Sequence, residues 1–219
     1  MRVMTGQLMR RVLLVATVVL PVLSGCQAMY FLTPEKGKPV KAEYTKIGTQ
    51  KVAVVVWADR QTLDVDPQAR RRICDAIVYH MKKNLEKATF VSGRDVETLQ
   101  EKSGLDWEQM TNAEIGKKLK CEVVIRVDLL EYTARGSVAQ ELRKGRVRGT
   151  INVYECGVGS GDDASYHTDI ACTYPKATDK PVNEMSDGDL IRETVVEFGQ
   201  EVAHKFYDHE VSYRGPGSR

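Results

Sequence analysis

The chain has 219 residues, a length sufficient to bury a substantial core without help from disulfides. Its 32 basic and 30 acidic side chains nearly balance, so its composition offers no overall electrostatic case for binding nucleic acid or an anionic membrane surface. These features indicate a globular protein whose partners are not nucleic acids.

The first 25 residues have the organisation of a bacterial signal peptide. Arg2, Arg10 and Arg11 form a basic leader without acidic residues, and an apolar stretch follows from Val12 to Leu23. As a helix this stretch would cover about 18 Å, which is too short to span a hydrocarbon core of ~30 Å comfortably. The segment ends in Leu23-Ser24-Gly25-Cys26.

That ending resembles the lipobox of bacterial lipoproteins. The resemblance implies cleavage before Cys26, a diacylglycerol on its sulfur and a fatty acyl chain, such as palmitate, on its new amine. Two or more acyl chains hold a protein stably on a membrane. Gln27 stands where an aspartate would retain a lipoprotein on the inner membrane, so we expect the outer membrane, with the domain facing the periplasm. An ordinary secretory peptide or an uncleaved anchor is the alternative.

Removal of the leader leaves 194 residues with 29 basic and 30 acidic side chains, because the leader contributes three arginines and no acid. We expect residues 26–50 to be the lipidated N-terminus and a tether, residues 51–211 a single α/β domain, and residues 212–219 a flexible tail. Within the tether, Tyr44 and Ile47 are spaced so that residues 42–47 could instead pack on the domain.

The domain begins with a β-branched run, Val52 to Trp57, that lacks alternation and predicts a strand covered on both faces. Asp66 and Pro67 then suit the start of a helix. Apolar residues recur every four positions after them and predict a long amphipathic helix. These residues are Ala69, Ile73, Ile77, Met81 and Leu85.

Shorter elements follow this helix. We expect a short strand at Phe90-Val91 and a small helix over residues 94–102. Thr111 and Glu114 make a capping box that predicts another short helix, which ends near residue 119. Residues 121–130 are again rich in valine and isoleucine, which predicts a second buried strand.

The pattern then changes to that of a hairpin with one wet face. Residues 146–155 and 166–174 alternate between apolar and polar side chains. The inward rows are Val147, Ile151 and Val153 in the first strand and Tyr166, Thr168, Ile170, Cys172 and Tyr174 in the second. Ser186 caps a last helix, whose apolar stripe is Ile191, Val195, Phe198, Val202 and Phe206.

This order of elements predicts an α/β (α+β) fold, a mixed sheet packed against two long and several short helices. The block from Lys51 to Tyr132 includes the sequences F-V-S-G-R-D and A-E-I-G-K-K-L-K-C-E-V-V-I-R-V. With the later hairpin, it resembles the N-terminal domain of TolB, the periplasmic part of the curli-secretion lipoprotein and the lipoprotein activators of penicillin-binding proteins. The chain has Leu119-Lys120-Cys121 where these proteins commonly have L-G-A. The resemblance implies a non-enzymatic envelope protein that docks other proteins.

Cysteines are the first candidates for a disulfide or a reactive group. Cys156 falls on the outward row of the hairpin and Cys172 on the inward row, which argues against a disulfide between them. We expect Cys74 and Cys121 to act as small apolar core residues. The sequence contains no Cys-x-x-Cys or His-Glu-x-x-His motif, so we expect no metal and no cofactor.

Two further features have both a plain and a functional interpretation. His204 and His209 lie five positions apart at the end of the last helix, not on one face, where we expect cations that suit its dipole. The glycine-rich segment 157–163 precedes a strand rather than a helix and lacks the lysine of a P-loop, so turn chemistry explains it better than phosphate or calcium binding.

Surface residues supply the candidate binding site. The basic row Arg143, Lys144, Arg146 and Arg148 is most simply a solvated strand face, and its functional alternative is a docking patch made by Arg146 and Arg148. We expect Trp57 in the core and Trp107, between two acids, to be exposed.

The sequence therefore favours a non-enzymatic interaction or scaffold module in envelope or cell-wall assembly, anchored through Cys26, with no catalytic residue identified. The alternative is a lipoprotein hydrolase or small-ligand-binding protein whose site is assembled from scattered residues. The envelope partners are not identified by any motif.

Overall fold

The computed structural model describes residues 37–134, 143–157, 163–176 and 185–211. The chain divides into two compact units, and the larger spans Lys41–His209. The smaller unit holds strand β1 (Lys38–Val40) and the last two residues of strand β7 (His209–Val211). These two strands form a two-stranded sheet.

A five-stranded sheet in the order β3-β2-β4-β5-β6 forms the centre of the larger unit. Its strands are β2 (Lys51–Trp57), β3 (Thr89–Phe90), β4 (Val123–Thr133), β5 (Gly145–Glu155) and β6 (Tyr166–Tyr174). β2 runs parallel to both β3 and β4, whereas β5 is antiparallel to both β4 and β6. The predicted mixed sheet is confirmed.

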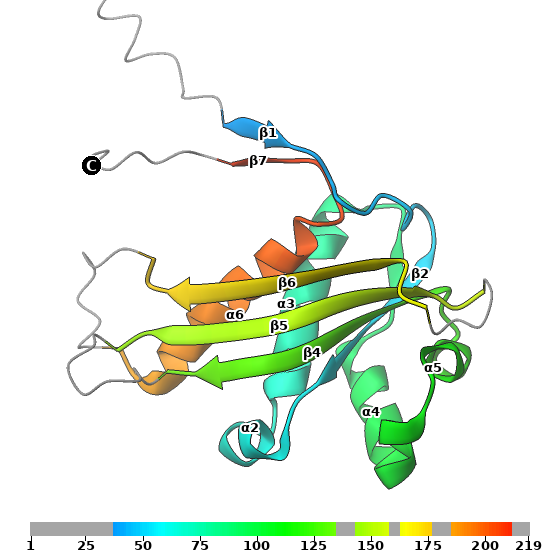
Figure 1. Cartoon of the computed structure of the whole chain (residues 1–219), viewed down its shortest axis with the longest axis horizontal. Coiled ribbons are helices and arrows are strands. Elements are labelled where there is room, and N and C mark those ends of the chain that lie inside the picture. Colours follow the sequence, from blue (N-terminus) through cyan, green and yellow to red (C-terminus); the bar gives the residue numbers. More distant parts are fainter. Residues whose placement is uncertain (1–36, 135–142, 158–162, 177–184, 212–219) are drawn as a thin grey trace, which may run out of the picture. The chain divides into compact units, whose positions relative to one another are not determined.

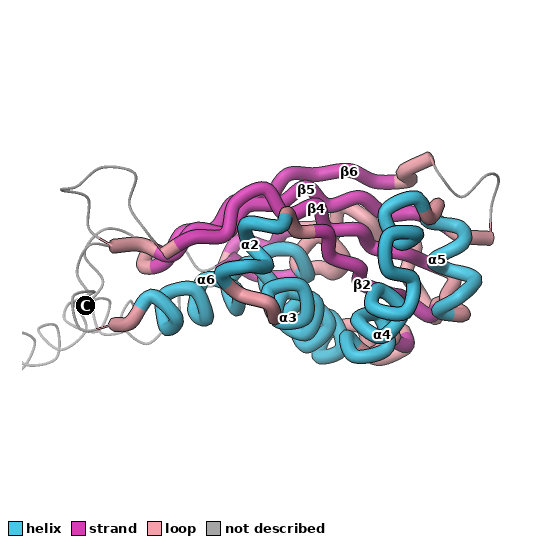
Figure 2. Tube along the Cα trace, turned by 90° about the horizontal axis from the view of Figure 1, so that it is seen from below, coloured by secondary structure: helices cyan, strands magenta, loops and turns pink. Residues whose placement is uncertain are grey.

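Helices cover the sheet unevenly. The long helices α3 (Ala69–Asn84) and α6 (Asp187–Ala203) pack against one face and lie behind the strands in Figure 1. The opposite face of β2 and β4 is covered by α4 (Gly93–Ser103), the 3-10 helix η1 (Gly104–Gln109) and α5 (Asn112–Leu119). In Figure 2, at right angles to the first view, α3 and α6 lie below β5 and β6.

The valine run of β2 explains why this strand is central. Val52, Val54 and Val56 belong to the large core against α3 and α6, and Ala53 and Val55 belong to a second core under α4, η1 and α5. All five are at most 2% exposed. A strand that buries both faces cannot alternate apolar with polar residues, and this matches the prediction.

Capping residues fix the ends of two helices. Thr111 and Glu114 form the predicted capping box of α5, and Ser186 with Asp189 forms a second one at α6. In each box the side-chain oxygen at the N-cap accepts a hydrogen bond from the backbone N–H three residues on, at 3.2 Å in α5 and 3.1 Å in α6. Such bonds satisfy N–H groups that the helix itself leaves unpaired.

Residues 41–47 are part of the larger unit, the second of the two arrangements considered for them. Tyr44 and Ile47 are 5% and 1% exposed and belong to the large core. The Tyr44 hydroxyl donates to Glu155 Oε1 at 3.0 Å, and the Lys205 ammonium donates to Glu43 Oε1 at 2.6 Å. Lys41 Nζ lies 2.7 Å from Asp208 Oδ2. We call this set of contacts the N-terminal clasp.

The start of α3 differs from the prediction. A six-residue helix that the sequence did not indicate, α2 (Arg60–Val65), precedes it and buries none of its side chains. Asp66 ends α2, and α3 begins at Ala69 after Gln68. The Asp66 carboxylate instead accepts a hydrogen bond from the backbone N–H of Gln68 at 3.1 Å. An apolar stripe predicts only helices that bury one face, so α2 left no signal.

Candidate docking surface

The hairpin half of the sheet leaves one face without a helical layer among the described residues. We define the open face as the side chains of β4, β5 and β6 that point away from α3 and α6 and lie beyond the second core. It consists of Arg126, Asp128, Leu130, Glu131, Thr133, Arg146, Arg148, Thr150, Asn152, His167, Asp169, Ala171 and Thr173. Figure 1 looks onto this face. All of these side chains are half-buried or exposed, whereas Val147, Ile151 and Val153 on the inward row are buried.

Polar side chains on the open face hold one another in place across three strands. Arg126 Nε donates to Asp128 Oδ1 at 2.8 Å, and Asn152 Nδ2 donates to Asp128 Oδ2 at 3.3 Å. His167 Nδ1 lies 2.7 Å from Asn152 Oδ1, so the chain of contacts continues from β4 through β5 to β6. Thr150 donates to Asp169 Oδ1 at 2.6 Å beside it. The middle of the open face is thus ordered by its own hydrogen bonds.

The open face meets the second core at an aromatic seam. The Arg126 guanidinium lies 4.1 Å from the centre of the Trp57 ring, a cation–π contact. Trp57 stacks on Trp107, with ring centroids 4.9 Å apart. Trp107 is only 3% exposed, so its predicted exposure was wrong. Its acidic neighbours in sequence point outward from η1, while the indole itself packs over β2.

Arg146 and Arg148, the predicted docking patch, lie toward the end of the open face where β5 begins. Arg148 is exposed and pairs in register with Glu131 of β4 and Ala171 of β6. Arg146 is half-buried and makes further interactions. Both side chains lie on the outward row, opposite in direction to Val147, so the two faces of the hairpin were predicted correctly.

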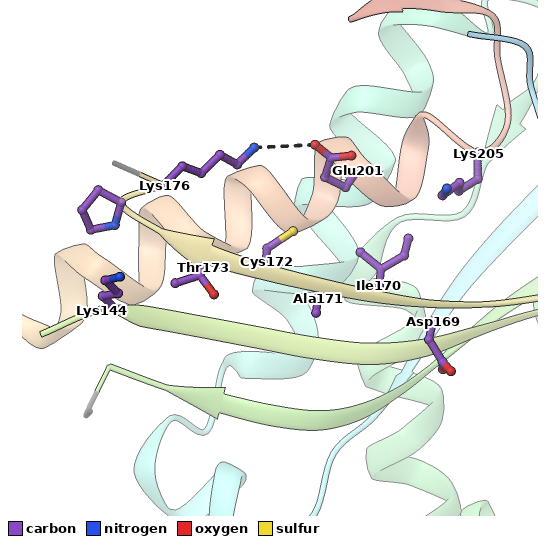
Figure 3. Close-up of a pocket in the computed structure, with 10 residues that line it drawn as sticks. Lys144, Asp169, Ile170, Ala171, Cys172, Thr173, Lys176, Glu201 and Lys205 are labelled. Atoms are coloured by element: carbon purple, nitrogen blue, oxygen red, sulfur yellow. Dashed lines mark ion pairs between the residues drawn. The ribbon is translucent and has the colours of Figure 1, made fainter. Parts of the chain in front are cut away.

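A groove runs along the outer edge of β6 (Figure 3). Its volume is about 570 Å³, and five consecutive strand residues, Asp169 to Thr173, line it. Glu201 of α6 and Lys205, which follows that helix, form the opposite wall, and Lys144 and Lys176 lie toward the Thr173 end. An ion pair of 3.7 Å joins Lys176 to Glu201. β6 is the last strand of the described sheet, so this groove follows a sheet edge.

Three of the described cysteines are buried apolar core residues whose thiols are not activated. Cys74, Cys121 and Cys172 are buried, and burial raises the pKa of each thiol to about 12. A thiol with so high a pKa is almost entirely protonated at neutral pH and reacts poorly. Cys156 does not form a disulfide with Cys172, as predicted; its thiol donates to the carbonyl of Asn112 at 3.4 Å.

The two C-terminal histidines do not occupy separate faces of a helix as expected. α6 ends at Ala203, and the chain then turns so that the rings of His204 and His209 stack with centroids 3.9 Å apart. Burial, then repulsion from His209, lowers the pKa of His204. The half-buried position of His204 at the C-cap of α6 thus disfavours its cationic form, which the predicted interaction with the helix dipole requires. No group of three or more potential metal ligands occurs within the described ranges.

A second hollow of about 610 Å³ lies beside α2 and the end of β4. There Tyr132 donates to Asp66 Oδ2 at 2.6 Å, and Arg72 lies 3.0 Å from the same oxygen. Burial and the bond to Asp66 raise the pKa of Tyr132. The Asp66 carboxylate is thus occupied by neighbours that tie the end of β4 to α3.

Several predicted features lie outside the described residues. Cys26 and the leader do so entirely, as does the tail after Val211, and most of the glycine-rich segment 157–163 does too. Among the residues that are described, no helix is both long enough and apolar enough to cross a membrane.

Comparison with known proteins gives distant structural similarity. No model of a known protein family matches the chain, and no curated protein matches its sequence. The PelC dodecamer from Paraburkholderia phytofirmans is 10% identical, with coverage of 78% of this chain and 97% of that one and a TM-score of 0.44. Lipoprotein GNA1162 from Neisseria meningitidis is 13% identical, with coverage of 70% and 98% and a TM-score of 0.40. A minor lipoprotein from Acinetobacter baumannii is 14% identical, with coverage of 74% and 92% and a TM-score of 0.35. Bacterial lipoproteins are therefore among the structural neighbours, at identities and TM-scores that assign no family.

Proposed function

We propose that the protein is a lipid-anchored envelope lipoprotein that acts as a non-enzymatic interaction module and docks its partner on the open face. The observation that carries this proposal is the open face itself: a regular sheet surface, lined by polar side chains, that the described helices leave uncovered. Arg146 and Arg148 provide its basic end.

The order of the open face favours binding. Asp128, Asn152 and His167 are already fixed by mutual hydrogen bonds, so a partner would immobilise few additional side-chain rotamers. Binding to a preorganised surface loses less conformational entropy than binding to a mobile one. Exposed charges contribute little to folding, so Arg148 is not required by the core.

The anchor in this proposal is Cys26. Residues 26–40 would then connect the lipid to the larger unit, and fully extended they would reach at most about 50 Å. The proposed location is the outer membrane, with the larger unit in the periplasm. Cys26→Ser should block lipid attachment and accumulate unprocessed precursor on immunoblots of cell fractions. Normal maturation and membrane partitioning of that variant would contradict the proposed anchor.

The docking role is tested by reversing the charge of the patch. Arg146→Glu with Arg148→Glu should keep the protein folded but lower its stability by about 1–2 kcal/mol, because Arg146 is half-buried and Arg148 lies opposite Glu131. The amount of partner crosslinked to the protein in intact cells should fall severalfold. The matched control is Lys82→Glu with Lys83→Glu, which makes the same charge change on exposed residues of α3.

The outcomes of this test are distinct. Reduced capture by the arginine variant alone supports docking on the open face. Unchanged capture, or an equal reduction in both variants, contradicts it. Loss of the folded state in the arginine variant would mean that Arg146 or Arg148 supports the core instead.

A further inference from the structure

Another basic surface, separate from the open face, lies where α4 and α5 are side by side (Figures 1 and 2). Four lysines border a hollow of about 500 Å³ there, and we call it the lysine groove. They are Lys51 at the start of β2, Lys102 in the last turn of α4, and Lys118 and Lys120 at the end of α5. No single stretch of sequence contains all four cations, so only the fold brings them together.

The lysine groove has few acidic groups to balance these cations. Within the described ranges, no ion pair or hydrogen bond engages any of the four ammonium groups. One carboxylate, that of Asp95, lines the groove. Outside it, Glu122 accepts a hydrogen bond from the backbone N–H of Lys51 at 2.5 Å. Glu114, four residues before Lys118, is held in the capping box of α5. The groove therefore presents an excess of positive charge that attracts anionic groups.

Helix dipoles explain only part of this charge. Cations are favoured in the last turn of a helix, which accounts for a lysine at the end of α4 and for those at the end of α5. The effect is local to each helix. It explains neither Lys51, which opens a strand, nor the convergence of two helix ends on one hollow.

Apolar side chains line the same groove. Phe90 of β3, Leu99 of α4 and Leu119 of α5 are half-buried, and Val91 is 5% exposed. A membrane surface is flat on this scale, so its head groups would reach the exposed lysines but leave the hollow unfilled. A protein segment that carries carboxylates and an apolar side chain meets both kinds of lining at once.

We propose that the lysine groove binds an acidic segment of a protein partner, with carboxylates on the lysines and an apolar side chain against Leu99 and Leu119. Complementary charges of this kind speed association and restrict the choice of partner. Burial of the apolar side chain adds affinity. This inference goes beyond docking on the open face and does not depend on it, because the groove and the open face share no residue.

Fluorescence polarisation of a labelled peptide, added to the full chain in micelles of a non-ionic detergent, tests the charges. The probe is a short glutamate-rich peptide with one leucine at its centre. The wild type should bind it, and added salt should weaken binding because it screens exposed charges. Lys102→Glu with Lys120→Glu should raise the dissociation constant about tenfold. Lys82→Glu with Lys83→Glu, on exposed residues of α3, is the matched control and should bind as the wild type does.

A second peptide, with serine in place of the leucine, tests the apolar contact. It should bind the wild type more weakly than the leucine peptide does, and Leu99→Ser in the protein should reduce the difference between the two. Thermal melting by circular dichroism verifies the fold of each variant. If Leu99→Ser failed to fold, the two peptides compared on the wild type would still measure the contact.

Three results would overturn the proposal. These are a wild type that does not bind the leucine peptide, a lysine variant that binds it as tightly as the wild type, and equal binding of the leucine and serine peptides. Complete displacement of the peptide by phosphatidylglycerol added to the micelles would assign the groove to an anionic membrane surface instead.

Discussion

The two halves of the sheet differ in the number of faces that helices cover. In the half built from β2 and the first residues of β4, helices cover both faces, so Val55 and Val124 are as completely buried as Val54 and Ile125. In the hairpin half, β5 and β6 rest on α6 with their inward row only. The same sheet therefore has one half that serves stability on both faces and another that has a face available for binding.

This difference predicts which residues can be substituted without loss of stability. In the covered half a substitution on either face meets packed neighbours, and a packed interior tolerates few changes of volume. On the open face a side chain meets solvent or a partner. Four predictions test the contrast.

The largest effect is expected for Trp107→Ala in the covered half. The indole is 3% exposed and stacks on Trp57 within the second core, so its removal leaves a large cavity. We expect the free energy of unfolding to fall by about 3–5 kcal/mol in urea titrations. Trp107→Phe should recover most of this loss. Arg148→Ala on the open face should change stability by less than ~0.5 kcal/mol, and a comparable cost at both positions would refute the contrast.

Gly116→Ala tests the boundary where α5 meets the end of β5. A Cβ at this position would lie 2.5 Å from Cys156 Sγ and 2.7 Å from Cys156 Cβ. We expect a loss of about 1–3 kcal/mol from overpacking, measured by chemical denaturation. Cys156→Gly in the same chain should relieve part of that loss, which a double-mutant cycle would detect. Gly188→Ala, whose Cβ would have no neighbour nearer than 3.8 Å, should not destabilise the protein.

Arg126→Ala tests the seam between the covered half and the open face. The side chain loses its cation–π contact with Trp57 and its ion pair with Asp128. We expect a loss of about 0.5–1 kcal/mol. The coupling with Asp128→Ala should lie within ~0.2–1 kcal/mol, as for other partly exposed pairs. A coupling energy of several kcal/mol between Arg126 and Asp128 would mean that water is excluded from this pair as it is from the second core.

The smallest effect is a pH dependence at the end of α6, the helix that supports the hairpin. Burial and His209 lower the pKa of His204, with His80 acting in the same direction and Glu201 opposing it. The unfolded chain therefore binds a proton at a higher pH than the folded chain does. Stability from this group is complete above the ordinary histidine pKa, and it declines as the pH falls from there through the lower folded value. Urea titrations between about pH 7.5 and 5 give the free energy of unfolding as a function of pH. This free energy should change less with pH in His204→Gln than in the wild type, and an identical pH dependence would contradict the assignment to His204.

The sequence predicted the elements that bury residues at regular intervals. The uninterrupted apolar run of β2 indicated two covered faces, and the alternation around Val147 and Ile151 identified the open face correctly. Helix α2 was not predicted because it buries nothing. Trp107 was assigned wrongly because its acidic neighbours suggested a solvated loop, whereas a tertiary layer covers the indole.

The candidate site was predicted only in part. The direction of Arg146 and Arg148 follows from periodicity within one strand. The chain of contacts from Arg126 through Asp128 and Asn152 to His167 joins residues on three strands, so it depends on a register that no local pattern specifies. The stacking of His204 on His209 likewise depends on a turn after α6.

The N-terminal clasp has a mechanical consequence. Once β1 has separated from β7, a pulling force on the chain ahead of Lys41 would load the clasp before it reached the five-stranded sheet, because residues 41–50 precede β2. Its exposed ion pairs, Lys41 with Asp208 and Glu43 with Lys205, resist little, at ~0–1 kcal/mol each. Tyr44 and Ile47 would yield next, at roughly 1.5–3 kcal/mol for each buried side chain. Peeling these ten residues would lengthen the connection by less than their extended length of about 35 Å and leave all five strands in place. The clasp would then unfold first under load and lengthen the chain while the five-stranded sheet stays folded.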